Sequence, residues 1–417
     1  MNNDVLDGLS ENTKDYWVTR SIPVLHNPTP LQFLREAVCA YHPVIITGAI
    51  STWPALQKWN KDYLIKTLGD RRVNVNLTPD GHGDCVKKCT KIKTIHDNSN
   101  SSVSYEADEP KDYFVYPAEH DMSISEFFEL LETGHEQAAT VVPVPYLSQQ
   151  NDNLRQSMPE LLEDIETSIQ LANEAFGSFA TSESAAGMLE AVNLWIGDER
   201  SVSSIHKDHY ENMYAVIAGE KTFTLLPPTD TAFLTPYTLS YPTLQYKVVE
   251  PNNPPTSPLR YIETSTSSYN NTNKITPPIH SSDTTNLQLE LQSENCPSEQ
   301  LEWLPLDTND PEVSYKYPLY KKTTPIQCTV HAGEILYIPA MWYHRVSQNC
   351  LTISVNYWYD QKFDFRYSFF YFYFFIFLFD YILFYRFVFY QTIKRIVENN
   401  SNNSSCIGEE QGNDALL

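Results

Sequence analysis

Residues 192–228 read VNLWIGDERSVSSIHKDHYENMYAVIAGEKTFTLLPP, and this stretch decides the fold. Its runs VNLWIG, YAVIAG and KTFTLL are rich in β-branched and aromatic residues, and glycine, proline or polar turns separate them, as is typical of short strands. Two later runs, GEILYIP at 333–339 and LTISVNYWYD at 351–360, continue the pattern. The spacing predicts an all-β sandwich or barrel from Ala191 onward.

His206 and Asp208 stand two positions apart in this stretch. On a strand, residues i and i+2 project to the same face, so the imidazole and the carboxylate can converge on one ion. A second histidine would complete the two-His, one-carboxylate set of non-haem Fe(II) oxygenases, which leaves coordination positions open. His344 is the favoured third donor and His331, at the opposite end of a strand, is the alternative. His209, adjacent to Asp208, should point the other way.

Lys221 lies thirteen positions after Asp208, on the next expected strand. A lysine is a compact point charge, and on a neighbouring strand it can pair with the distal carboxylate of a keto-acid cosubstrate. The alternative is a solvated hairpin residue after Gly219. An H-x-D triplet alone also occurs by chance, so the candidate site depends on these residues occurring together.

The first half of the chain mixes helix and strand signals. Helices are expected in LQFLREAVCAYHP and in TWPALQKW with DYLIKTLG, which Gly69 should end. A further helix, SISEFFELLE, should begin with a capping box between Ser123 and Glu126. Strands are expected over 43–50 and 71–81, each stopped by a turn signal.

Two segments look irregular. Residues 82–112 are rich in Lys, Ser, Asn and Asp and predict a mobile loop. Residues 252–300 are packed with Pro, Ser, Thr and Asn and carry few apolar residues, which predicts a disordered insertion between strands. The expected regions are an N-terminal arm (1–30), a helix and strand region packed on the core (31–190), the β core (191–366) and a tail (367–417).

The tail carries an aromatic-rich segment, SFFYFYFFIFLFDYILFYRFVFYQ, at 368–391. It is long enough to span a bilayer, but Asp380 and Arg386 would be costly inside one. Codons for Phe, Tyr, Ile and Leu are T-rich, so the preferred interpretation is a translated intron or another gene-model error. A genuine membrane anchor at 369–390 and a buried core segment are the alternatives.

The formal net charge is −23. This charge disfavours a nucleic-acid partner, which needs a basic surface, and favours a cationic one such as a Lys- or Arg-rich protein segment. Acidity that serves solubility alone is the equal alternative. The seven cysteines form no CxxC pair, which indicates a reducing compartment. With no signal-peptide pattern at the N-terminus, we expect a cytoplasmic or nuclear protein.

Taken together, residues 192–228, AGEILYIPAMWYHRV at 332–346 and ISVNYWYD resemble the jumonji-C oxygenases, and within them the lysyl (3S)-hydroxylases. The likeness covers about residues 20–85, 113–250 and 300–370. It implies a mainly β fold with outer helices, namely a double-stranded β-helix or cupin-like jelly roll. It also implies Fe(II) as the metal and 2-oxoglutarate and O2 as cosubstrates.

The same resemblance implies roles for individual residues. The metal ligands would be His206, Asp208 and His344. The residues implied around 2-oxoglutarate are Lys221, Tyr146, Ser203, Asn212 and Asn356, with Trp358 packing behind. The implied substrate is a lysine of developmentally regulated GTP-binding proteins, hydroxylated at C3, and Asp198, Glu199 and Glu211 are candidate acids for it. The implied partners are this protein substrate and a second copy of the chain in a homodimer.

Other activities stay open at this point. One is a metal-dependent peptidase acting on methylated histone tails, although no H-E-x-x-H motif occurs in the sequence. Another is a histone lysine demethylase, which shares the oxidative chemistry but releases formaldehyde. The third is a non-catalytic cupin binding module, which would be expected to have lost a ligand or the lysine.

Overall fold

The computed structural model describes residues 21–96, 103–136, 142–177, 188–249, 259–263, 287–293 and 296–361. Residues 1–20 of the expected arm and the aromatic-rich tail lie outside these ranges. Among the described residues, no helix combines the length and the apolar character that crossing a bilayer needs.

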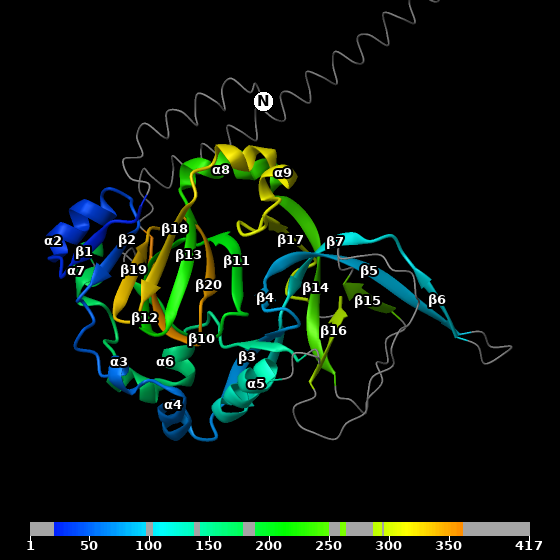
Figure 1. The fold of residues 1–417 in the computed structure, drawn as a ribbon, viewed down its shortest axis with the longest axis horizontal. Coiled ribbons are helices and arrows are strands. Elements are labelled where there is room, and N and C mark those ends of the chain that lie inside the picture. Colours follow the sequence, from blue (N-terminus) through cyan, green and yellow to red (C-terminus); the bar gives the residue numbers. More distant parts are fainter. Residues whose placement is uncertain are drawn as a thin grey trace, which may run out of the picture. The chain divides into compact units, whose positions relative to one another are not determined.

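Two facing sheets form the core of the described chain (Figure 1). The first has the order β1 (Val24–His26), β2 (Val44–Thr47), β19 (Glu334–Ile338), β12 (Tyr210–Ala218), β21 (Thr352–Asp360), β10 (Leu189–Gly197). The second has the order β18 (Ile326–His331), β13 (Glu220–Leu226), β20 (Tyr343–Gln348), β11 (Val202–Lys207), β4 (His82–Gly83). From β10 to β13 and from β18 to β21, successive strands alternate between the sheets. This alternation is that of a jelly roll and confirms the predicted double-stranded β-helix.

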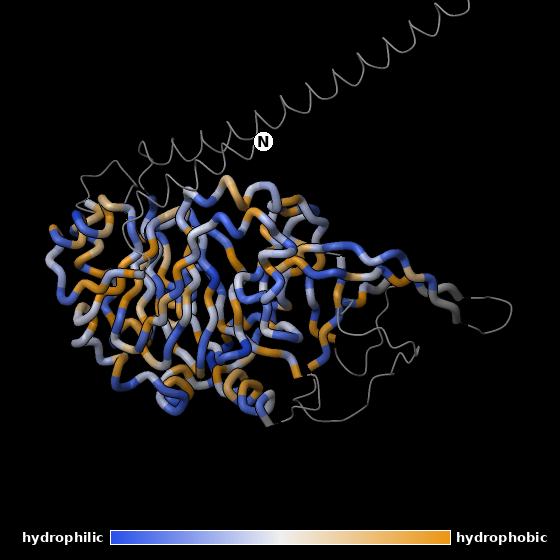
Figure 2. Tube along the Cα trace, turned by 45° about the horizontal axis from the view of Figure 1, so that its top comes forward, coloured by the Kyte–Doolittle hydropathy of each residue, from blue (hydrophilic) through white to orange (hydrophobic). Residues whose placement is uncertain are grey.

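Side chains of alternate strand residues fill the space between the two sheets. Tyr214 and Val216 of β12 pack inward with Phe223 of β13, and all three are buried. Met213 and Ala215, which alternate with Tyr214 and Val216 along β12, enter the other core on the outer face of the first sheet. The alternation of side chains with a period of two, from which the strands were predicted, therefore divides the residues of β12 between two cores. Figure 2 shows the hydrophobic residues concentrated among these packed strands.

Helices cover the outer face of the first sheet. Phe33 and Phe176 place their rings 5.1 and 6.1 Å from that of Tyr337 on β19. Of the predicted helix starts and ends, the capping box is confirmed, because the backbone N–H of Glu126 donates to Ser123 Oγ and that of Ser123 to the Glu126 carboxylate. The helices are α2 (Pro30–Phe33) with a π turn (Leu34–Val38), α3 (Ala55–Lys58), α4 (Lys61–Leu68, ended by Gly69), α5 (Ile124–Glu136), α6 (Asn153–Ser157), α7 (Gln170–Phe176), α8 (Thr231–Leu234) and α9 (Val313–Lys316), with short 3-10 turns at Pro159–Asp164, Pro228–Asp230, Thr235–Tyr237 and Pro318–Lys322.

The predicted loop at 82–112 and the predicted disordered insertion at 252–300 are wrong where the structure describes them. Both contribute strands to a third sheet, whose members are β5 (Cys85–His96), β6 (Val103–Ala107), β7 (Lys111–Tyr116), β14 (Leu239–Val249), β15 (Leu259–Glu263), β16 (Gln288–Gln292) and β17 (Gln300–Trp303). The β5 and β6 pair projects away from the jelly roll (Figure 1). Their partners are distant in sequence: Cys89, for example, pairs with Glu263. Composition in a local window cannot show such pairing, so polar strands resembled loops.

A fourth, three-stranded sheet leads the chain toward the site. Its order is β8 (Ala118–Ser123), β3 (Arg72–Thr78), β9 (Val144–Tyr146). Tyr146 pairs with Asn76 at the end of β9, and the next residue, Leu147, forms a bridge with Ile196 of β10. The bridge joins this sheet to the jelly roll and fixes the position of Tyr146.

Candidate metal and cosubstrate site

Three side chains meet at one end of the adjacent strands β11 and β20 of the second sheet. His206 on β11 is the direct cross-strand partner of His344 on β20, and their ring centroids are 4.3 Å apart. Asp208, two residues beyond His206, places one carboxylate oxygen 3.8 Å from His206 Nε2 and the other 3.5 Å from His344 Nε2. One potential ligand atom from each residue lies within 4.8 Å of the others, so the three could hold a single metal ion.

Backbone hydrogen bonds orient both imidazoles for this role. His206 Nδ1 donates to the carbonyl oxygen of Ser204 at 2.7 Å, and His344 Nδ1 donates to that of Trp342 at 3.1 Å. A ring that donates from Nδ1 keeps its Nε2 lone pair free for a cation. The donor set therefore fits a divalent metal without a change of tautomer.

The electrostatics of the three groups favour the same states. Burial opposes ionisation of Asp208, but the neighbouring His206 and His344 outweigh burial and lower the pKa of Asp208 to about 2. Burial, and then the charge of His344, lower the pKa of His206. Burial alone would lower the pKa of His344, yet its contact with Asp208 raises it. An ionised carboxylate beside a neutral His206 is the state in which metal ligands bind.

Lys221 is a buried cation on β13. Its side chain has no exposed surface, and its Nζ donates to Tyr146 Oη at 3.1 Å and to Gln348 Oε1 at 3.4 Å. The Nζ also lies 5.2–5.8 Å from the ring centroids of Tyr146, Trp195 and Tyr214. No carboxylate in the described part of the chain pairs with it. Burial lowers the pKa of Lys221 to about 7, and an anionic ligand would reverse that effect.

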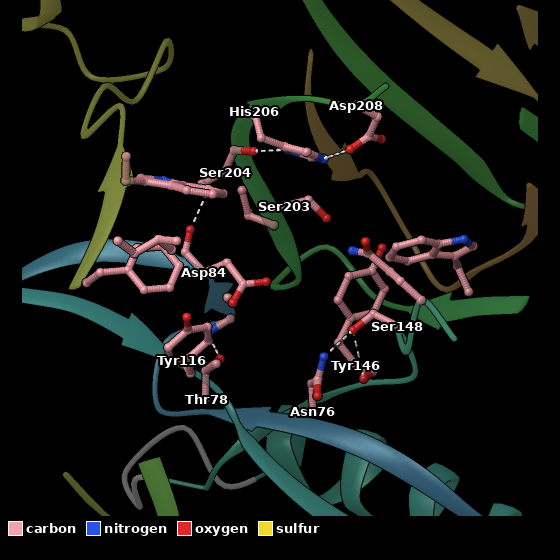
Figure 3. A pocket seen from close by; sticks show the side chains of 18 of the residues that line it. Asn76, Thr78, Asp84, Tyr116, Tyr146, Ser148, Ser203, Ser204, His206 and Asp208 are labelled. Carbon is pink, nitrogen blue, oxygen red and sulfur yellow. Dashed lines mark hydrogen bonds and ion pairs between the residues drawn. The ribbon is translucent and has the colours of Figure 1, made fainter. Parts of the chain in front are cut away.

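A cavity of about 330 Å³ lies beside these groups. Tyr146 and Ser203 line it together with His206 and Asp208, and Figure 3 shows their side chains around the same space. Burial raises the pKa of Tyr146, although the nearby Ser203 hydroxyl acts against burial. The Tyr146 hydroxyl therefore stays protonated and can donate to an acceptor in the cavity.

Asn212 and Asn356 lie one layer behind this cavity and do not line it. Asn356 Nδ2 donates to Asn212 Oδ1 at 3.3 Å, while Asn356 Oδ1 accepts from Trp195 Nε1 at 2.9 Å and from Asn193 Nδ2 at 3.2 Å. The two asparagines thus hold Trp195, which in turn contacts Lys221. Trp358 is buried beside them and stacks on Tyr210 with 4.8 Å between ring centroids.

The alternative donors lie elsewhere. His331 sits at the other end of the sheet, where its Nδ1 is 3.1 Å from a Glu220 carboxylate oxygen, and His209 is exposed. Two of the candidate substrate acids have internal partners: Asp198 pairs with Arg200, and Glu211 accepts from Tyr337 Oη at 2.7 Å.

Glu199 is exposed beside His135 and Asp198, a second group that could hold a metal. The bidentate contact of Arg200 with Asp198 already neutralises that group, which disfavours a cation there.

Sequence reasoning missed several residues of the site. Gln348 lies four positions after His344, and the period of two along β20 could have placed it on the same face. Asp84 and Trp303 also line the cavity, but they lie in or beside the segments that were predicted to be irregular. No local signal identified them.

Comparison with known proteins agrees with this geometry. Residues 30–365 match the family model described as the cupin-like domain. The human bifunctional peptidase and (3S)-lysyl hydroxylase JMJD7 is 34% identical over 85% of this chain and 89% of its own length. JmjC domain-containing protein E of Dictyostelium discoideum is 32% identical, covering 87% and 91%. Lysine-specific demethylase JMJ32 of Arabidopsis thaliana is 34% identical, covering 82% and 82%.

Proposed function

Because this chain belongs to the cupin-like family of JmjC proteins, we propose that it is an Fe(II)- and 2-oxoglutarate-dependent oxygenase that hydroxylates a lysine side chain of a protein. One observation carries the proposal: two imidazoles and a carboxylate converge beside a cavity, next to a buried lysine that has no acidic partner among the described residues. A binding module without catalysis would not need both features.

In this proposal His206, Asp208 and His344 hold Fe(II). Their three donors occupy part of the coordination sphere and leave the remaining positions to the two cosubstrates. When bound, Fe(II) supplies the oxidation of an unactivated C–H bond, coupled to conversion of 2-oxoglutarate and O2 to succinate and CO2. The backbone carbonyls of Ser204 and Trp342 keep both rings in the tautomer that binds a metal.

Lys221 and Tyr146 hold the distal carboxylate of 2-oxoglutarate, with Ser203 beside them. The charge of Lys221 and the hydroxyl hydrogen of Tyr146 are both available to an acceptor, and the aromatic rings exclude water from the pair. Trp195 keeps its place through its hydrogen bond to Asn356. Asn212 and Asn356 therefore act through Trp195 rather than on the cosubstrate itself.

The relatives and the charge of the chain support the choice of substrate. The name of the human relative describes a (3S)-lysyl hydroxylase, and the chain carries a net charge of −23, which complements a cationic protein segment. We propose a lysine of developmentally regulated GTP-binding proteins, modified at C3. The names of the relatives also include the words peptidase and demethylase. An experiment must therefore distinguish hydroxylation, demethylation and peptide cleavage.

The test uses the full chain loaded with Fe(II) and 2-oxoglutarate under nitrogen, with peptides from such GTPases, before air is admitted. Hydroxylation predicts a peptide one oxygen heavier and an equal amount of succinate. Formaldehyde release would indicate demethylation instead, and shortened peptides without succinate would indicate a peptidase. The His206→Ala variant should lose the oxidised product, whereas His331→Ala, a matched histidine outside the site, should keep it.

A further inference from the structure

Asp84 faces into the cavity from the side opposite Tyr146, the hydrogen-bond partner of Lys221. It joins β4 to β5 and has a left-handed backbone conformation, with φ of 49°, which aspartate and asparagine tolerate better than most residues. The Ser204 hydroxyl donates to the Asp84 carbonyl oxygen, which ties this corner to the strand that carries His206. Figure 3 shows the Asp84 carboxylate pointing toward the middle of the cavity, across from Tyr146.

The Asp84 carboxylate has no counter-ion in the part of the chain that the structure describes. Within the described ranges, no side chain donates a hydrogen bond to it or forms an ion pair with it. Lys87, close in sequence, is already paired with Asp80 at 2.6 Å and with Glu263 at 3.3 Å. Burial, and then the charge of Glu119, raise the pKa of Asp84 to about 6. In these surroundings a cationic group that enters beside the carboxylate stabilises its ionised form.

Aromatic rings line the cavity next to Asp84. The ring centroid of Phe114 is 4.8 Å from that of Tyr116 and 4.9 Å from that of Trp303. Trp303 also lies parallel to His206, with 6.4 Å between centroids and 13° between planes. The rings thus extend from a proposed metal ligand toward the wall that carries the acid. An aliphatic chain that ends in a cation suits apolar rings followed by a carboxylate.

We propose that Asp84 is a specificity-determining residue that pairs with the ammonium group of the substrate lysine, while Trp303 and Phe114 contact its methylene groups. This inference rests on the proposed function, because it assumes a lysyl substrate. Lys221, buried behind Tyr146 of one wall, selects an anionic cosubstrate, and Asp84 on another wall selects a cationic substrate. The two molecules are then sorted by charge within one cavity.

The first test compares steady-state hydroxylation of a lysine peptide with that of the same peptide carrying norleucine, which lacks the charge. Asp84→Asn keeps the shape of the side chain and tolerates the left-handed backbone. Glu119→Gln is the matched control, because it removes the same charge from an exposed residue that does not line the cavity. Asp84→Asn should raise the KM for the lysine peptide about 10- to 100-fold, and Glu119→Gln should change it less than about threefold.

The neutral peptide separates recognition from damage. Asp84→Asn and the wild type should handle the norleucine peptide alike, because neither can form the ion pair with it. An Asp84→Asn variant that keeps the wild-type KM for lysine would overturn the inference. Equal losses on both peptides would also overturn it, because they indicate a structural role.

A second measurement needs no turnover, so it separates this inference from the proposed function. Saturation transfer from the protein to n-pentylammonium, and to neutral 1-pentanol as control, is followed by NMR. We expect saturation transfer to the methylene protons of n-pentylammonium in the wild type and in Glu119→Gln, and its loss in Asp84→Asn. Transfer to 1-pentanol should be equal in all three proteins. If the wild type modifies no lysine peptide, the proposed lysyl hydroxylase function is wrong. If saturation transfer to n-pentylammonium persists in Asp84→Asn, the proposed role of Asp84 is wrong, whatever the outcome for the function.

Discussion

Replacing Lys221 with methionine should stabilise the protein without cosubstrate and remove its stabilisation by 2-oxoglutarate. Burial lowers the pKa of Lys221 from 10.5 to about 7. The folded state therefore binds fewer protons than the unfolded state between these values. The resulting destabilisation is absent above pH 10.5, grows as the pH falls toward 7 and is complete below it. At pH 7.5 it is on the order of 4 kcal/mol, since one pKa unit corresponds to about 1.4 kcal/mol.

Methionine has a similar length and no charge, so Lys221→Met relieves this destabilisation. It also leaves Tyr146 Oη and Gln348 Oε1 without their present partner, which costs roughly 1 kcal/mol for each group. The net expectation is a gain of about 2 kcal/mol in the free energy of unfolding. Urea denaturation at pH 7.5 without cosubstrate measures it.

The same variant tests cosubstrate binding. With Mn(II) present, 2-oxoglutarate at one hundred times the Kd of the wild type should stabilise the wild type by about 2.7 kcal/mol. The same concentration should stabilise Lys221→Met by almost nothing, because the variant binds it much more weakly. Lys207→Met is the matched control: Lys207 also lines the cavity, but its Nζ lies 5.1 Å from the ring centroid of Tyr343 and the residue is not buried. A Lys221→Met variant that is less stable than the wild type without cosubstrate, or equally protected by it, would refute the reasoning.

Three other predictions concern the metal, the pH and the backbone. His206→Ala should abolish stoichiometric Mn(II) binding, as followed by water-proton relaxation; retained binding would contradict the ligand assignment. The Kd for 2-oxoglutarate should rise about tenfold per pH unit above pH 7, because binding favours protonated Lys221; calorimetry showing a flat profile would argue against that contact. Gly81→Ala should destabilise the fold by several kcal/mol, because its φ is +83° and a Cβ there would lie 1.8 Å from the Arg200 carbonyl oxygen. Gly333→Ala, with φ of +90° and open space around it, should cost only about 1 kcal/mol in the same denaturation experiment.

The parts of the site that follow from periodicity could be predicted from the sequence. The rule that strand residues two apart share a face correctly predicted that His206 and Asp208 converge, although Asp208 lies one residue past the end of β11. Lys221 lies on β13, in the same sheet as β11 but separated from it by β20. The choice of His344 over His331 rested on which end of a strand each histidine occupies, and the structure places only His344 beside Asp208. Order along the chain and local pattern carry that much information.

Asp84 and Trp303 could not be found this way. Asp84 follows β4, a strand of two residues that joins the second sheet only by pairing with β11, more than a hundred positions later. Trp303 ends β17, whose partner β14 lies on the other side of the segment that was predicted to be disordered. Their positions depend on long-range strand pairing, which no local composition encodes. Acids that looked suitable in the sequence, such as Glu211, instead satisfy hydrogen bonds inside the core.

The cross-strand pairing of His206 with His344 has a consequence for how the protein matures. The two residues are 138 positions apart, and strands of three sheets lie between them in sequence. Closing so long a stretch of chain is a late event in folding, so a nascent or partly unfolded chain offers at most the two donors His206 and Asp208. Binding of a metal ion by all three donors would thus require that the last strands have already joined the sheets, and the bound ion would stabilise the completed jelly roll.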